Sequence, residues 1–292
     1  MEKILGYIRL MRPANVVTSV ADVLAGIAIS GFFLTLESYV TVTLLCISTI
    51  GLYSGGIIFN DVFDADLDKI ERPERSIPSG LITVKEAVIF GSVFFVIGII
   101  TAGLCNRYAL IISLLIVVAC LTYNKWLKHH VIFGPLNMGL CRGLNLLLGI
   151  SILPPEVQSW WFLAITPIVY ISSITMISRG EVHGGSKKTL YFASLLYLIV
   201  IFSILYFSYT NNHITLTLVF VMAFGWMIFN PLFTAINKPV SQNIGKAVKA
   251  GVIAMILLNA AWASAFGTWQ VALIIVILLP LSLLLSKTFA VT

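Results

Sequence analysis

Apolar runs of about 20 residues recur along the whole chain, and polar residues gather in the short segments between them. Each run is long enough to cross a hydrocarbon core of roughly 30 Å as a helix. We predict nine such spans, at 15–34, 39–60, 84–104, 108–127, 132–153, 159–178, 189–209, 213–236 and 247–287. The last block is long enough for one tilted helix or for two helices joined near Gly267. The pattern predicts an all-α membrane protein, a bundle of about nine transmembrane helices in a single domain over residues 1–292.

Composition and charge agree with this class. Hydrophobic residues make up 59% of the chain and charged residues only 10%, whereas a soluble domain has about 25% charged residues. If the loops alternate sides, nearly all Lys and Arg residues between spans share one side, and only Arg107 and Lys287 lie on the other. The positive-inside rule then predicts a protein of the cell (inner) membrane with a cytoplasmic N-terminus. The net charge of +6 follows from this topology, so no nucleic-acid partner is expected.

An acidic cluster ends the second predicted span. Residues 60–68 read NDVFDADLD, and they include every aspartate of the chain except Asp22. Carboxylates at membrane depth are costly and usually mark an ion or substrate path. A helix through Asn60, Asp64 and Asp68, spaced i, i+4 and i+8, would place all three on one face, with Asp61 on the neighbouring stripe. This column predicts a magnesium site; the alternative is a solvated acidic loop balanced by its own basic neighbours.

Basic residues follow the acidic cluster directly. Pro73 is expected to end the helix, after which Arg72 and Arg75 can fold back as bidentate donors to phosphate oxygens. Carboxylates that hold magnesium next to arginines that hold phosphate are the groups needed to bind a diphosphate.

These motifs resemble a known family. The string NDVFDADLDKIERPERSIPSG is similar to the first aspartate-rich motif, NxxxDxxxD followed by RPxRPxPSG, of the UbiA superfamily of intramembrane prenyltransferases. An RPxN start at residues 12–15, a YxKxLK loop at 123–128 and a Gly-rich fifth span with Arg142 and Asn145 also fit. The resemblance implies a helical bundle around a central cavity that opens toward lipid. It also implies magnesium-dependent transfer of a prenyl group from its diphosphate to an aromatic or other small lipophilic acceptor.

The resemblance and the residue chemistry together give the predicted site. The predicted magnesium ligands are Asn60, Asp61, Asp64, Asp68 and Glu181. The predicted catalytic residues are Asp64, Asp68, Tyr123 and Lys125. The predicted substrate-binding residues are Asn15, Asp22, Arg72, Arg75, Arg142, Asn145, Arg179 and Lys187. The expected partners are a prenyl diphosphate, its acceptor and membrane lipid.

The chain departs from the family at the second acidic motif. UbiA-type enzymes carry a DxxxD-like stretch between the sixth and seventh spans, but residues 177–189 read ISRGEVHGGSKKT and hold no aspartate. Glu181 is the one carboxylate there, with His183 as a less favoured ligand. The string SRGEVHGG resembles the EboC-type branch of the superfamily, which is linked to envelope-directed secondary metabolism. A catalytically silent prenyl-lipid-binding protein or a carrier is therefore the alternative function.

Several polar residues lie inside the predicted spans. Asn15 and Asp22 share a stripe on the first span, and Arg142 and Asn145 lie on the fifth. Such groups face the bundle interior, either as hydrogen-bonding contacts between helices or as the wall of a polar cavity. We favour the cavity wall for Asp22 and Arg142, which could also pair with each other. A proton-coupled transporter would use the same residues, but it would leave the RPERSIPSG segment unexplained.

Overall fold

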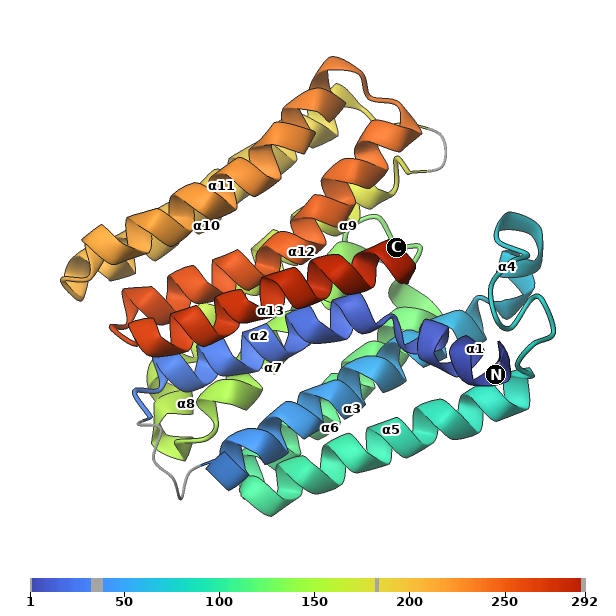
Figure 1. The fold of residues 1–292 in the computed structure, drawn as a ribbon, viewed down its shortest axis with the longest axis horizontal. Coiled ribbons are helices and arrows are strands. Elements are labelled where there is room, and N and C mark those ends of the chain that lie inside the picture. The colour runs from blue at the N-terminus through green and yellow to red at the C-terminus, as the bar shows by residue number, and fades with distance from the viewer. Residues whose placement is uncertain (1, 33–38, 182–183, 290–292) are drawn as a thin grey trace.

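The computed structural model describes residues 2–32, 39–181 and 184–289, and every regular element in these ranges is a helix (Figure 1). The helices are α1 (Glu2–Met11), α2 (Pro13–Ile29), α3 (Tyr39–Phe63), α4 (Ala65–Glu71), α5 (Val84–Cys105), α6 (Arg107–Thr122), the π-helix η1 (Tyr123–Leu127), α7 (Phe133–Ile150), α8 (Pro154–Trp160), the 3₁₀ helix η2 (Trp161–Ala164), α9 (Ile165–Ser178), α10 (Lys187–Thr210), α11 (Ile214–Asn237), α12 (Ser241–Ala265) and α13 (Trp269–Thr288).

The prediction of a transmembrane helical bundle is confirmed. Within the described ranges, nine helical segments are long and apolar enough to cross a membrane. The C-terminal block forms two helices, α12 and α13, and Gly267 between them has a φ of +80° that favours glycine. The fifth predicted span is α7, which is not among the nine because Arg142 and two asparagines lower its hydropathy.

The return of the chain along α13 corrects one part of the predicted topology. Thr288, at the end of α13, lines the same cavity as Arg9 and Arg12 near the N-terminus. Lys287 therefore lies at the basic end of the bundle and not at the opposite end, as predicted from a single long C-terminal span. The correction strengthens the charge asymmetry, because it leaves Arg107 as the exception.

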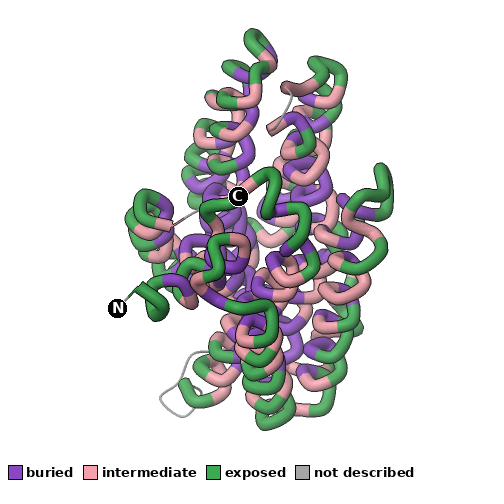
Figure 2. The backbone as a smooth tube through the Cα atoms, turned by 90° about the vertical axis from the view of Figure 1, so that its right-hand side faces the viewer, coloured by how far each residue is buried: buried purple, intermediate pink, exposed green. Residues whose placement is uncertain are grey.

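The bundle has inner and outer helices. The helix α2 contacts α3, α7, α12 and α13, so it lies at the centre of the fold (Figure 1). Buried residues concentrate in the interior of the bundle and exposed residues on its outside (Figure 2). The helices α5, α6, α10 and α11 carry many of the exposed large apolar side chains. Such a surface suits contact with lipid tails.

Glycines allow α2 and α7 to approach closely. A Cβ atom on Gly26 would come within 2.2 Å of the Leu146 carbonyl oxygen, and one on Gly149 within 2.2 Å of the Val23 carbonyl oxygen. Any larger residue would force the two backbones apart. The close contact matters because these two helices carry the polar residues buried in the middle of the bundle.

Polar residues fix where the long helices begin. Thr83 and Glu86 form a reciprocal capping box at the start of α5, and the Asn106 side chain accepts from Ala109 N at the start of α6. The Ser186 side chain accepts from Lys188 N at the start of α10. The first backbone N–H groups of a helix have no acceptor within that helix, and these side chains supply one.

Labelling of introduced cysteines tests the topology. Asp66 and Gln158 are exposed and lie in the short helices α4 and α8, at opposite ends of the bundle (Figure 1). In a background without native cysteines, Asp66→Cys in intact cells should resist an impermeant thiol reagent, and Gln158→Cys should react with it, because residues 61–83 are predicted to be cytoplasmic. Permeabilised cells serve as the control. Equal labelling of both positions in intact cells would contradict this topology.

Candidate functional site

A cavity of about 290 Å³ opens among α2, α3, α6, α7, α9 and α12. Its polar end, here called the rim, is formed by Arg12, Asn60, Asp64, Arg72, Tyr123, Asn124, Lys128 and Glu181. Its other polar end, the floor, is formed by Asn15, Tyr53, Arg142 and Asn145. The walls between them include Leu52, Ile57, Ile116, Met138, Ile171, Ile174, Val248 and Val252. The cavity therefore has a charged entrance above an apolar chamber.

A second cavity of about 630 Å³, the vestibule, adjoins the rim. It shares Arg12, Arg72 and Glu181 with the rim and adds Arg9 and Arg75 from the surrounding loops and helices. Four arginines and three acidic residues, Asp61, Glu74 and Glu181, line the vestibule, so the approach to the rim is charged, with a small excess of positive charge.

The acidic cluster is almost continuously helical, as predicted. Asp64 lies between α3 and α4, yet its backbone N–H donates to Asn60 O at 3.0 Å, and Asp68 N donates to Asp64 O at 2.8 Å. The helix α4 ends at Glu71, because the residue before Pro73 is disfavoured in a helix. Asn60 and Asp64 line the rim, whereas the buried Asp68 lies outside the cavity wall.

Each buried carboxylate of the cluster has a basic partner. Asp61 pairs with Arg12 at 2.7 Å and with Arg75 at 3.3 Å, and Arg75 also pairs with Asp68 at 2.7 Å. Asp64 pairs with Lys128. These cations offset the mutual repulsion of the aspartates, so the cluster is folded into a basic frame before any ligand arrives.

Glu181 approaches the rim from the opposite side, in the loop between α9 and α10. Its Oε1 atom is buried and has no hydrogen-bond partner among the described residues. Burial raises the pKa of the Glu181 carboxyl, and the charge of Arg72 partly opposes this shift. A buried acceptor without a partner is costly, so this oxygen is available to a metal ion or to a donor from a ligand.

The oxygen donors at the rim fit magnesium. Asn60 and Asp64 lie on one side and Glu181 on the other. Within the described residues, no three His, Cys, Asp or Glu side chains come together closely enough to hold a metal by themselves. Magnesium commonly binds one or two carboxylates and takes its remaining ligands from water and substrate phosphates. The arrangement therefore suits magnesium that arrives with a phosphate ligand.

In the loop at 123–128, the lysine that reaches the rim is a different one from the lysine predicted. Lys128 lines the rim, while the exposed Lys125 stacks over the Trp126 ring at 4.6 Å. The cause is the π-helix η1, in which Lys128 N donates to Tyr123 O. Its wider turn brings residues five apart onto one face, which an α-helical reading of YxKxLK misses.

Two other predicted basic residues lie away from the cavity. Arg179 donates from Nη2 to His130 O at 2.6 Å, and Lys187 is exposed at the first turn of α10. Their phosphate-binding roles stay predictions, as does that of Arg75, which lines the vestibule. His183 lies outside the described residues.

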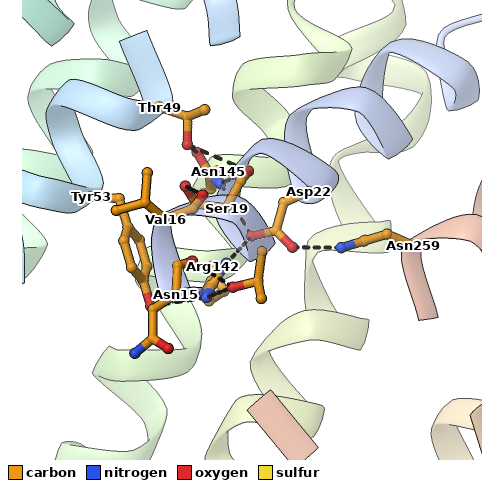
Figure 3. A network of polar contacts seen from close by, with 10 residues as sticks. Asn15, Val16, Ser19, Asp22, Thr49, Tyr53, Arg142, Asn145 and Asn259 are labelled. Atoms are coloured by element: carbon orange, nitrogen blue, oxygen red, sulfur yellow. Dashed lines mark hydrogen bonds and ion pairs between the residues drawn. The ribbon is translucent and has the colours of Figure 1, made fainter. Parts of the chain in front are cut away.

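The floor is one hydrogen-bonded network (Figure 3). Arg142 donates from Nη1 to Asp22 Oδ2 at 2.7 Å, which confirms that these two residues pair, although Asp22 itself lies behind the cavity wall. Nη2 of Arg142 donates to Thr18 Oγ1 at 2.7 Å and to the Tyr53 hydroxyl at 2.9 Å. Asn145 and Asn259 both donate to Asp22, at 3.1 and 2.7 Å. Two members of this network, Asn259 and Tyr53, are not among the site residues predicted from the sequence.

Comparison with known proteins places this geometry in context. The profile of the UbiA prenyltransferase family matches residues 20–242. The digeranylgeranylglyceryl phosphate synthase of Sulfurisphaera tokodaii is 34% identical over 170 residues, which cover 58% of this chain and 60% of the relative. The synthase of the same name from Saccharolobus solfataricus is 33% identical over 173 residues, covering 59% of each chain. The chain thus matches about three fifths of the length of these relatives.

Solved structures share the fold. A UbiA homolog from Aeropyrum pernix superimposes with a TM-score of 0.69 at 18% identity, over 84% of this chain and 96% of that one. A UbiA homolog from Archaeoglobus fulgidus, solved with DMAPP and Mg²⁺, superimposes with a TM-score of 0.67 at 17% identity, over 90% and 99% of the two chains.

Proposed function

The chain belongs to the UbiA prenyltransferase family and is a multi-pass integral membrane protein, and from this premise we propose that it transfers a prenyl group from a prenyl diphosphate to a lipophilic acceptor. One observation carries the proposal: the oxygen donors Asn60, Asp64 and Glu181 meet the cations Arg72 and Lys128 at the rim of an apolar chamber. A prenyl diphosphate has the matching shape, with a charged head that needs metal and cations and a tail that needs an apolar cavity.

The reaction uses these groups in place. Magnesium, when bound with the diphosphate, adds positive charge at the departing oxygens. Lys128, Arg72 and Arg12 bind the same oxygens, so they stabilise the negative charge that grows as the allylic carbon–oxygen bond breaks. The acceptor supplies the electron pair for the new bond to that carbon, and its proton passes to the released diphosphate. The apolar walls keep water from the electron-poor allylic carbon, where it would otherwise add.

Other parts of the proposal rest on the sequence and on the relatives. The cytoplasmic position of the rim and the location in the cell membrane follow from the charge asymmetry of the loops. Membership of the EboC-type branch stays a prediction. The curated relatives are named for a glyceryl phosphate product, so a hydroxyl acceptor is supported alongside the aromatic acceptor that the family resemblance implies.

Substitution of Glu181 tests the rim. Glu181→Gln should lower magnesium-dependent release of diphosphate from geranylgeranyl diphosphate by about tenfold or more, because a lost contact to a charged group is worth about 1.5–3 kcal/mol. The matched control is Glu156→Gln, since Glu156 lies at the other end of the bundle and accepts from Trp160 Nε1. Wild-type release by Glu181→Gln would show that the second loop holds no metal.

The raised pKa of Glu181 adds a pH signature to the same test. A proton competes with magnesium for the carboxylate. The affinity for magnesium should therefore fall as the pH falls through the pKa of Glu181, which lies above that of an ordinary glutamate. Glu181→Gln should lack this step. Binding of the diphosphate without any release in the parent protein, at every pH, would instead favour the catalytically silent binding protein.

A further inference from the structure

The floor of the cavity is polar but carries no net charge. It exposes one guanidinium, Arg142, whose charge is matched by a carboxylate directly behind the cavity wall, Asp22; the two residues are 4% and 1% exposed. Their remaining partners within the network are neutral amides and hydroxyls. Because the pair neutralises itself, the floor offers hydrogen bonds to a ligand without attracting an anion or a cation.

A buried ion pair contributes little net stability to the fold, which favours a functional role for this network. Removing two charges from water costs several kcal/mol per ion, and an apolar replacement is often equally stable. Four helices nonetheless supply side chains to this one point, namely α2, α3, α7 and α12. Polar groups at membrane depth commonly mark a substrate path, and here Tyr53, Arg142 and Asn145 also face the cavity.

Tyr53 is the member of the network best placed to bind a ligand. Arg142 donates to the Tyr53 hydroxyl oxygen at 2.9 Å, and a guanidinium cannot accept a hydrogen bond. The hydroxyl proton of Tyr53 must therefore point to a different acceptor, and the side chain lines the cavity. The contact with a guanidinium also polarises the hydroxyl and makes it a stronger donor.

The floor lies below the position proposed for the diphosphate. Tyr53 and Asn60 are about two turns apart on α3, roughly 10 Å along the helix axis. An oxygen atom held at Tyr53 would lie deeper than the charged head of a prenyl diphosphate at the rim. This is the side from which an acceptor can approach an allylic carbon without meeting the departing phosphate.

We propose that the floor is the acceptor subsite and that it selects an uncharged acceptor whose hydroxyl or carbonyl oxygen accepts a hydrogen bond from Tyr53. The inference rests on the proposed prenyl transfer and narrows its acceptor. A phosphate or carboxylate at the floor would lose its hydration and find the charge of Arg142 already matched by Asp22. The subsite therefore differs from the basic rim and vestibule, where an anionic group would bind.

The test compares two acceptors that differ only in charge. The protein in lipid nanodiscs is given geranylgeranyl diphosphate and either an alkylglycerol or the phosphate ester of the same alkylglycerol. Equilibrium binding of each radiolabelled acceptor is measured as well as its prenylation. We expect binding and prenylation of the alkylglycerol, with at least about a tenfold preference over its phosphate ester, since an unpaired buried charge is costly.

Two matched tyrosine variants locate the effect. Tyr53→Phe keeps the ring that stacks on Arg142 at 4.4 Å, and it should weaken alkylglycerol binding about tenfold while KM for the diphosphate stays unchanged. Tyr170→Phe is the control, because buried Tyr170 donates to Gly251 O and lies outside the cavity wall. Tyr170→Phe should leave the Kd for the alkylglycerol and the KM for the diphosphate at their wild-type values.

The outcomes separate this proposal from the proposed function. A preference for the phosphate ester would overturn the neutral subsite even if transfer occurs. Equal dissociation constants of the alkylglycerol for Tyr53→Phe and Tyr170→Phe would overturn it too. Failure of both probes to bind would overturn it as well. Alkylglycerol binding that is weakened by Tyr53→Phe, without any transfer, would support the subsite and contradict the transferase.

Discussion

Asp64→Asn is expected to lower magnesium-dependent binding of a prenyl diphosphate by about a hundredfold or more, while the protein stays folded in the membrane. Asp64 is the aspartate of the cluster that lines the rim, beside Asn60 and opposite Glu181. Outer-shell groups at metal sites already cost about 10–100-fold in metal affinity when they are removed, so a direct ligand should cost at least as much. The measurement is binding of geranylgeranyl diphosphate in nanodiscs, with magnesium and with a chelator.

The acidic cluster supplies its own control. Asp66→Asn makes the same change two residues away, but the Asp66 side chain is 95% exposed and pairs only with Lys69 among the described residues. It should bind the diphosphate as the wild type does. Asp68→Asn should lose less diphosphate affinity than Asp64→Asn, because Asp68 pairs with Arg75 and lies outside the cavity wall. Equal binding by Asp64→Asn and the wild type would favour the solvated acidic loop over a metal site.

Asp22→Leu is expected to destabilise the folded protein by about 3–5 kcal/mol, because it leaves the buried Arg142 charge without its counter-ion. Asn145 and Asn259 lose their carboxylate acceptor in the same variant. Thermal unfolding in nanodiscs or mild detergent measures the effect as a lowered midpoint.

The double variant shows whether the charge is the cause. Combining Asp22→Leu with Arg142→Met removes both ions and should restore most of the lost stability, since apolar replacement of a buried pair is often neutral. If the double variant is less stable than Asp22→Leu alone, the pair does not account for the cost.

The sequence predicts the parts of this fold that depend on long-range composition and on local spacing. Apolar runs gave the helices, and the i, i+4 spacing of Asn60 and Asp64 placed both on the rim, because α3 runs to Phe63 without interruption. The possible pairing of Asp22 with Arg142 was also expected, since ionised groups in a bundle interior require partners.

Other features depend on geometry that composition does not encode. The choice of Lys128 over Lys125 comes from the π-turn of η1, which changes the angular spacing along that helix. The division of the C-terminal block rests on the positive φ at Gly267, and apolar composition alone fits one or two helices. The contribution of Asn259 to the floor joins residues more than two hundred positions apart, a contact that only the packed bundle defines.

The most direct test of the central claim is a turnover measurement on the intact protein. Nanodisc-embedded protein is incubated with labelled geranylgeranyl diphosphate, magnesium and a neutral lipid extract of the native membrane. We expect equal amounts of released diphosphate and of a new prenylated lipid, with both lost on chelation and in Asp64→Asn. Tight, magnesium-dependent binding with neither product would contradict the transferase.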